Sequence, residues 1–191
     1  VVDENCDGCA YCIDPCPYKA LTLIEYMYQG SIKKTVERDA ALCKGCGVCA
    51  SECPTGAMQL KQFKDDQIIA AIEALFKPGE HKDAKGGFKP VVLCFACQWC
   101  SYAAADLAGV SRIQYPPNVR VLRVPCSGRV DVNHVVTAFQ NGADGVIITG
   151  CLIGDCHYID GNVKAKERAD IMKKSIKAIG IDPKRLEIEF A

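Results

Sequence analysis

Residues 6–17 read CDGCAYCIDPCP, and residues 43–54 read CKGCGVCASECP. Each stretch places four cysteines at the same intervals and follows the last of them with proline, so the second stretch is a repeat of the first. The agreement extends further, because Ala20 and Ala57 each follow the last cysteine of their run by four residues. The repeat therefore predicts two equivalent binding sites near the start of the chain.

The spacing C-x2-C-x2-C-x3-C-P is the cysteine run that binds pairs of 4Fe–4S clusters. Three thiolates in a tight loop reach one cluster, and the fourth, expected at the start of a helix, points away and reaches the other cluster. The predicted ligands of the first 4Fe–4S cluster are Cys6, Cys9, Cys12 and Cys53. The predicted ligands of the second are Cys43, Cys46, Cys49 and Cys16. Glycines inside the runs let the backbone approach the cluster sulfides and donate N–H groups to them.

This module resembles the two-cluster ferredoxins from Asn5 to Leu60, with every cysteine of the family motif present. The resemblance implies an α+β ferredoxin domain that carries electrons. Residues 21–24 and 31–36 fit its short hairpin, with a turn near residues 29–30. The alternative is a structural zinc site built from two C-x2-C pairs. Zinc needs only four ligands, however, and each run has a further cysteine at the same step.

The whole chain has 191 residues, of which 14 are cysteine, 49% are hydrophobic and 24% are charged, and its net charge is zero. This composition fits one or two globular domains. Zero net charge argues against nucleic-acid binding, which needs a basic surface. No apolar run is long enough to span a membrane, and residues 1–6 do not resemble a signal peptide. We therefore expect a reducing, cytoplasmic location in which closely spaced cysteines bind metal instead of forming disulfides.

After the ferredoxin module, expected over residues 1–63, residues 64–89 fit a helix followed by a linker. Apolar residues recur at helical spacing over Asp65–Phe76, which predicts a helix that packs on its own domain in preference to a partner. Residues 77–89 are polar and rich in glycine, as in an exposed linker.

Residues 90–191 alternate short apolar strands with amphipathic helices, which predicts an α/β domain with a mainly parallel four-stranded sheet. The expected strands are 91–94, 119–124, 146–149 and 186–190, and the expected helices are 101–110, 131–141 and 163–179. Six cysteines fall at the expected carboxyl ends of strands, where open parallel sheets bind ligands. They are Cys94, Cys97, Cys100, Cys126, Cys151 and Cys156. The sequence therefore predicts a third redox or metal centre, assembled from three loops.

Spacing alone leaves the nature of this third centre open. Four thiolates suit a 2Fe–2S cluster. Cys97 and Cys100 flank Trp99 in C-x2-C spacing, which also suits a dithiol redox pair. Zinc is a third option. His157 stands beside Cys156 and is a candidate iron ligand of the Rieske kind, although a lone histidine is more often a hydrogen-bonding neighbour.

The stretches CQWCSYAAADLAGVSRIQYPPNVRVLRVPCSGRVD (97–131) and GADGVIITGCLIGDCHYIDGN (142–162) resemble the delta subunit of methyl-viologen-reducing hydrogenase, the MvhD family. The resemblance covers nearly all of Phe95 to Leu186 and implies a 2Fe–2S cluster. Its ligands are expected to be four of five cysteines, with Cys94 outside the family pattern and expected to be a buried strand residue. The five are Cys97, Cys100, Cys126, Cys151 and Cys156.

The order of ferredoxin module, connector and MvhD-like domain resembles the C-terminal end of the flavin-carrying subunit of the heterodisulfide reductases of methanogenesis, in its fused form. This implies an electron relay from a hydrogenase or formate dehydrogenase, through the 2Fe–2S and two 4Fe–4S clusters, to a flavin-containing heterodisulfide reductase core that bifurcates electrons. It also implies a multi-subunit complex, with a dimer as one arrangement, and a chain that is part of a longer protein. The sequence has no G-x-G-x-x-G after a strand, so we expect the flavin elsewhere.

No nucleophile–base pair or phosphate loop is visible, so we expect no catalytic site in this chain. The rival interpretation is a dithiol/disulfide oxidoreductase that uses Cys97 and Cys100 and is fed by the ferredoxin domain. Four arginines are candidates for partner docking or for stabilising anionic clusters, against the simpler interpretation of ordinary surface charge. They are Arg112, Arg120, Arg123 and Arg129.

Overall fold

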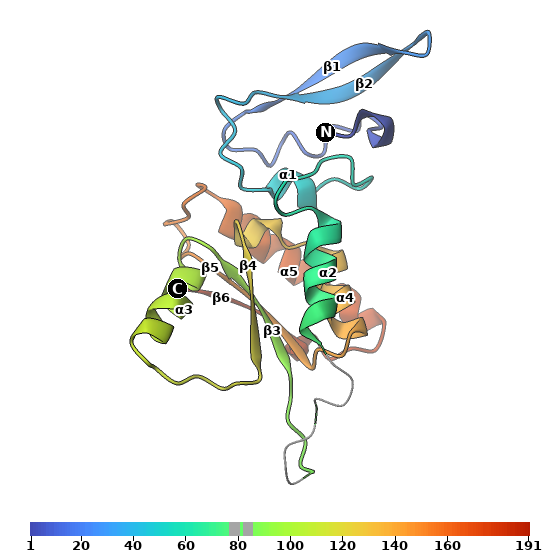
Figure 1. Cartoon of the computed structure of the whole chain (residues 1–191). Helices are drawn as coiled ribbons and strands as arrows, with labels where there is room; N and C mark the ends of the chain where they lie inside the picture. Colours follow the sequence, from blue (N-terminus) through green and yellow to red (C-terminus); the bar gives the residue numbers. More distant parts are fainter. Residues whose placement is uncertain (77–80, 82–85) are drawn as a thin grey trace.

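The computed structural model describes residues 1–76, 81 and 86–191, and Figure 1 shows two packed halves. The ferredoxin-like half, residues 1–63, contains a hairpin, a short helix and the cysteine-rich loops. The α/β half, residues 90–191, contains a four-stranded sheet with helices on it. This architecture confirms the predicted fold class. No helix in the described part of the chain is long and apolar enough to cross a membrane.

The hairpin of the ferredoxin-like half consists of β1 (Leu21–Tyr28) and β2 (Ser31–Arg38), which pair antiparallel. Its two turn residues, Gln29 and Gly30, have φ angles of 49° and 80°. A two-residue hairpin turn requires such left-handed backbone. The turn prediction is therefore confirmed, and both strands extend beyond their expected ends.

The short helix α1 (Val48–Ser51) corrects one expectation about the cysteine loops. The fourth cysteine of each run was expected to begin a helix, but α1 ends before Cys53. The reason is local: Lys19 and Gly56, each three residues after a fourth cysteine, have φ angles of 50° and 67°. Left-handed backbone at these positions stops a helix from forming after the cysteine.

The sheet of the α/β half is wholly parallel, with strand order β4-β3-β5-β6. Its strands are β3 (Val92–Cys97), β4 (Val119–Val124), β5 (Gly145–Gly150) and β6 (Leu186–Phe190). β3 is longer than expected, because Phe95 and Ala96 are apolar and continue it into the core. Cys94 therefore lies inside β3. Its expected position in a strand is confirmed, but its expected place at the carboxyl end of that strand was wrong.

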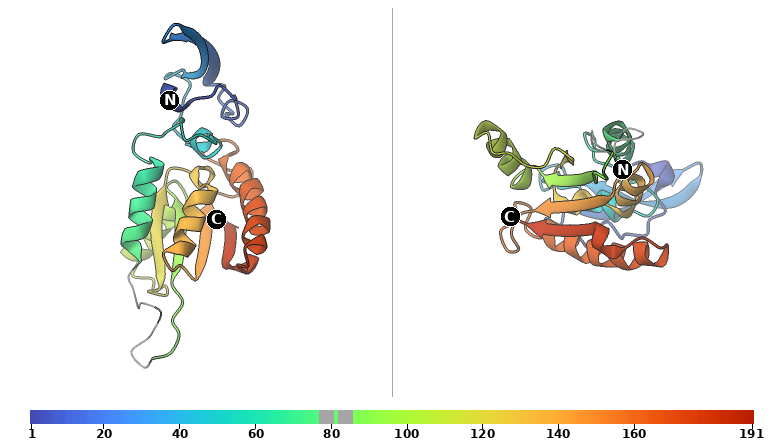
Figure 2. Two further views of the ribbon diagram at one scale, coloured as in Figure 1. Left: turned by 90° about the vertical axis from the view of Figure 1, so that its right-hand side faces the viewer. Right: turned by 90° about the horizontal axis from the view of Figure 1, so that it is seen from below.

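Helices α2, α4 and α5 lie side by side on one face of this sheet, and α3 lies on the other side (Figure 2). The helices are α2 (Asp65–Leu75), α3 (Ser101–Val110), α4 (Val132–Gln140) and α5 (Gly161–Ala178). Two short 3-10 helices, η2 (Ser127–Arg129) and η3 (Pro183–Arg185), follow β4 and precede β6.

The connector helix α2 belongs to the core of the α/β half. Ile68 and Ile72 are buried in one cluster with Leu93 and Phe95 of β3, and α2 packs on α4. The prediction that this helix packs on its own chain is confirmed. Most of the predicted linker, residues 77–80 and 82–85, lies outside the described residues.

Candidate metal centres

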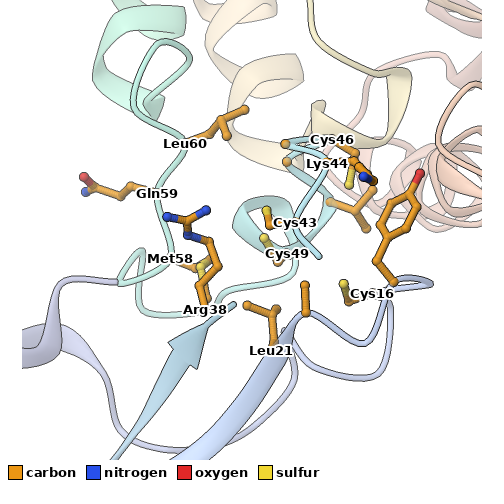
Figure 3. A pocket seen from close by; sticks show the side chains of 15 residues that line it. Cys16, Leu21, Arg38, Cys43, Lys44, Cys46, Cys49, Met58, Gln59 and Leu60 are labelled. Carbon is orange, nitrogen blue, oxygen red and sulfur yellow. The ribbon is translucent and has the colours of Figure 1, made fainter. Parts of the chain in front are cut away.

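The cysteines of the ferredoxin-like half line two cavities. The proximal cavity is lined by Cys16, Cys43, Cys46 and Cys49, whose side chains surround a common space in Figure 3. The distal cavity is lined by Cys6, Cys9, Cys12 and Cys53. Each cavity takes three cysteines from one run and the fourth from the other. The structure thus brings together the two sets that the spacing grouped.

The two cysteine loops fold alike because their repeat extends to the backbone. Residues at matching positions share left-handed φ angles, including two that are not glycine. The matching pairs are Gly8 and Gly45 (72° and 74°), Ala10 and Gly47 (65° and 83°), and Lys19 and Gly56 (50° and 67°). Non-glycine residues keep this backbone only where their surroundings hold them in it. The two loops therefore share one backbone conformation, in which the first three cysteines of each run line the same cavity.

Some of the thiols in the two cavities have a shifted pKa. Burial raises the pKa of Cys12 to about 11 and that of Cys49 to about 12. Burial acts in the same direction at Cys53, but the N–H of Met58, 3.4 Å from its Sγ, helps to hold its pKa below the usual range. A buried thiol loses its proton readily only when a metal cation binds the resulting thiolate. The donor sets therefore fit iron–sulfur clusters: four thiols each, around a common cavity, with a backbone N–H group beside Cys53.

Three side chains around the cavities were not singled out from the sequence. Arg38 and Lys44 line the proximal cavity, where their positive charge offsets the charge of four thiolates. Met58 lines both cavities, so the two sites share a wall. Lys44 stands inside a cysteine run, which is a usable sequence signal. Arg38 reaches the cavity only through the pairing of the hairpin.

All five cysteines of the MvhD-like pattern meet at the carboxyl edge of the parallel sheet, which we call the third site. The sulfur atoms of Cys97, Cys100 and Cys151 lie within 4.8 Å of one another. Cys126 is fully buried and interacts with both Cys97 and Cys156, so these two cysteines have a common neighbour. The three loops that carry them follow β3, β4 and β5.

The sixth cysteine of this half has a different environment. The Sγ atom of Cys94 lies 3.7 Å from the hydroxyl oxygen of Thr149, which comes from the neighbouring strand β5. Burial raises its pKa. Cys94 therefore behaves as a strand residue with a local hydrogen-bonding partner.

Crowding at the third site perturbs the acidity of its thiols in opposite directions. Interaction with Cys126 lowers the pKa of Cys97 to about 5 and that of Cys156 to about 6. The same interactions, with Cys156 first, raise the pKa of Cys126 well above its usual range. Burial raises the pKa of Cys151 to about 12. A cation that binds several thiolates relieves this competition for protons, so the donor set fits a metal group.

An aromatic stack covers the third site. The rings of Trp99 and His157 are nearly parallel, with centroids 3.6 Å apart, and tie the loop after β3 to the loop after β5. An open hollow beside the stack is lined by Cys100 and Cys151. Stacking gives His157 a role that needs no metal.

The four candidate arginines have different surroundings. Arg129 is fully buried: its Nη2 donates to the Phe63 carbonyl (3.0 Å) and to Asp65 Oδ1 (2.6 Å). Its interpretation as a docking residue was therefore wrong, because two groups more than 60 residues away in sequence hold it inside. Arg120 donates to the Leu75 carbonyl, and the guanidinium of Arg123 lies over a tyrosine ring.

Two family profiles match the sequence. The 4Fe–4S dicluster domain matches residues 5–57. The methyl-viologen-reducing hydrogenase delta subunit matches residues 92–191, more than half of the chain. The chain belongs to this delta-subunit family. The ferredoxin-like half thus precedes a domain of the delta-subunit family, as the resemblance predicted.

Some curated relatives match nearly the whole chain, and others match about half of it. One is a subunit of the ferredoxin:CoB-CoM heterodisulfide reductase of Methanosarcina mazei, 45% identical over 183 residues, which cover 96% of this chain but 21% of that protein. Another is an iron-sulfur subunit of the F420-non-reducing hydrogenase of Archaeoglobus profundus, 52% identical over 103 residues, which cover 54% of this chain and 75% of that protein. The chain thus spans about a fifth of the heterodisulfide reductase subunits that it matches. It is an iron–sulfur electron-transfer protein of the hydrogenase and heterodisulfide reductase type.

Proposed function

We propose that the chain is an electron relay with three centres: a 2Fe–2S cluster in the third site and a 4Fe–4S cluster in each cavity of the ferredoxin-like half. The observation that carries this proposal is the contiguity of the three sites. Met58 lines both cavities, and one buried cluster contains Cys46 of the proximal cavity and Cys126 of the third site. Clusters bound there would supply one-electron chemistry, while the protein supplies thiolates, burial and N–H donors.

The proposed ligands follow the grouping in the fold. The distal 4Fe–4S cluster takes Cys6, Cys9, Cys12 and Cys53, and the proximal one takes Cys43, Cys46, Cys49 and Cys16. The 2Fe–2S cluster takes four of Cys97, Cys100, Cys126, Cys151 and Cys156. Residues 1–63 and 90–191 are thus the two functional units, joined by residues 64–89.

The partners are proposed from the relatives. Relatives of the α/β half are named as hydrogenase subunits, and relatives of nearly the whole chain are named as heterodisulfide reductase subunits. A hydrogenase or formate dehydrogenase would therefore deliver electrons at the third site, beside the open hollow. The ferredoxin-like half would pass them to a flavin-containing heterodisulfide reductase core, where bifurcation takes place. This assignment implies a multi-subunit complex in the cytoplasm.

Two other functions use the same cysteines. A dithiol oxidoreductase is favoured by the low pKa of Cys97, about 5, next to Cys100 in C-x2-C spacing. A structural zinc site is favoured by the closeness of three sulfur atoms, which suits a single tetrahedral ion. Both alternatives leave the two cavities of the ferredoxin-like half with their 4Fe–4S clusters.

Metal and sulfide analysis of the anaerobically purified chain separates these functions. The relay requires about ten irons per chain and a third iron centre in electron paramagnetic resonance (EPR) spectra during graded reduction. A dithiol enzyme would contain about eight irons and would react with an alkylating agent after reduction. Zinc in place of the last two irons would indicate the structural site.

Serine variants then identify the ligands of the third site. Four of the five single variants should lose the third EPR signal and roughly two irons, and the fifth should keep both. Cys94→Ser is the matched control, because Cys94 lies in β3 beside Thr149. Loss of the third signal in this control would contradict the proposed ligand set.

A further inference from the structure

The two halves meet at a joint formed by the segment 47–52, the segment 126–130 and the start of α5. The Ser51 hydroxyl donates to the Gly128 carbonyl (2.7 Å), and Arg168 Nη1 donates to the same oxygen (3.0 Å). The other terminal nitrogen of Arg168 pairs with Glu52. Arg168 is almost completely buried, so these bonds are shielded from water. The joint therefore ties the cysteine loop of the proximal cavity to the loop of Cys126.

Glycine allows the backbone of each half to approach side chains of the other half closely at this joint. A Cβ atom on Gly128 would stand 2.6 Å from Val48 Cγ2 and 2.7 Å from the Gly161 carbonyl oxygen. A Cβ atom on Gly47 would stand 2.7 Å from Arg129 Cδ. Distances this short leave no room for the halves to slide past each other, because packed interiors resist compression. The separation between the proximal cavity and the third site is therefore fixed by the fold.

Tyr158 occupies the buried cluster between these two sites. It packs in one cluster with Cys46, Val48 and Cys126, and it is 5% exposed. Tyr18 and Cys156 pack against the same cluster. Tyr158 belongs to neither proposed ligand set. Its ring thus packs in the same buried cluster as a proposed ligand of one centre and a candidate ligand of the other.

We propose that Tyr158 is a positioning residue that sets the rate of electron transfer between the proximal cavity and the third site. This proposal rests on the relay function. Electron tunnelling slows steeply as the gap between centres widens, and it is slower across empty space than across packed atoms. The ring of Tyr158 fills the gap, and the joint keeps the gap constant. Tyr158 itself is neither oxidised nor reduced.

The test compares Tyr158→Ala and Tyr158→Phe in the anaerobically loaded full chain. Two readouts are needed at equal iron content: the intramolecular electron-transfer rate after photoreduction, and the EPR splitting from magnetic interaction between the two centres. Tyr158→Ala should slow the transfer by about tenfold or more. It should leave the splitting unchanged, because the joint keeps the distance between the centres constant, and each centre should keep its own signal. Tyr158→Phe should match the wild type because the ring remains. Tyr115→Ala, at an exposed tyrosine, is the matched control and should change neither readout.

Each outcome decides the proposal. An unchanged rate in Tyr158→Ala at full iron content overturns the role of Tyr158, and so does an equal slowing in Tyr158→Phe. If Tyr158→Ala fails to retain iron, Tyr158→Leu replaces it and must transfer more slowly than Tyr158→Phe; equal rates refute the proposal. A wild-type iron count of about eight refutes the relay and this proposal with it.

Discussion

The two halves of the molecule build their candidate metal sites in opposite ways. In the ferredoxin-like half, three cysteines of each site lie in one short loop, and only the fourth comes from the other loop. In the α/β half, the five cysteines are scattered from Cys97 to Cys156 and meet only because a parallel sheet aligns three loops. The first kind of site depends on local turns, and the second depends on the whole domain. Substitutions should therefore affect the two halves differently.

The largest expected effect tests the exchange of cysteines between the two loops. Cys53→Ser should remove the distal cluster, about four irons, although Cys53 lies in the same run as three proximal cysteines. Cys16→Ser should remove the proximal cluster instead. Iron analysis and EPR spectra of both variants check this. Loss of the cluster of its own run in either variant would contradict the grouping.

A core substitution far from the cysteines should distinguish the sites that depend on local turns from the third site, which depends on the whole domain. Leu186 is fully buried in β6, and Leu186→Ala should cost about 2–5 kcal/mol of stability in the α/β half. The third site should then lose its metal at a lower temperature, while the two ferredoxin-like sites keep theirs. Iron release to a chelator during anaerobic heating measures this, with Leu107→Ala on the exposed side of α3 as the control. Simultaneous loss from all three sites would show that the halves are not independent.

The joint should be sensitive to a single methyl group. Gly128→Ala places a Cβ atom 2.6 Å from Val48 Cγ2, so overpacking should cost about 1–3 kcal/mol. Gly109→Ala is the matched control: Gly109 lies in α3 with open space around its Cβ position, and alanine should be neutral or stabilising there. Urea unfolding followed by fluorescence of Trp99, the only tryptophan, gives both values. Equal stability of the two variants would show that the joint can relax.

The smallest expected effect concerns Asp65, which attaches the connector helix α2 to the α/β half. A hydrogen bond from His134 Nε2 (3.0 Å) and the pairing with Arg129 hold the pKa of Asp65 at about 2. Because this value lies below the unfolded one, about 3.9, the stabilisation is present above that pH and is lost as the pH falls toward 2. Asp65→Asn should cost about 1–2 kcal/mol at pH 7, since partial exposure screens the pair.

Urea unfolding of the metal-free, reduced chain at pH 7 and at pH 2–3 checks the role of Asp65. The difference between wild type and Asp65→Asn should shrink in acid, because the stabilisation from the charge of Asp65 is lost as the pH falls toward its folded-state pKa of about 2. A difference that stays constant with pH would indicate that Asp65 acts through packing instead of charge.

The sequence predicted the parts of the molecule that depend on spacing and alternation. The cysteine runs gave the grouping around both cavities, and the alternation of strands and helices gave the parallel sheet and its cysteine edge. Arg129 was misjudged because its partners, Phe63 and Asp65, are distant in sequence, and a buried arginine has no local signature. Cys94 was misplaced because an apolar run does not mark where a strand ends. Tyr158 has no sequence signal, since its position matters only after the halves have packed.

The shared wall at Met58 and the buried cluster around Tyr158 give the three sites a fixed serial order. Among the described residues, the distal cavity shares no lining side chain with the third site. In the proposed relay, a donor docked beside the third site and an acceptor docked beside the distal cavity would therefore use separate surfaces and could be bound at the same time.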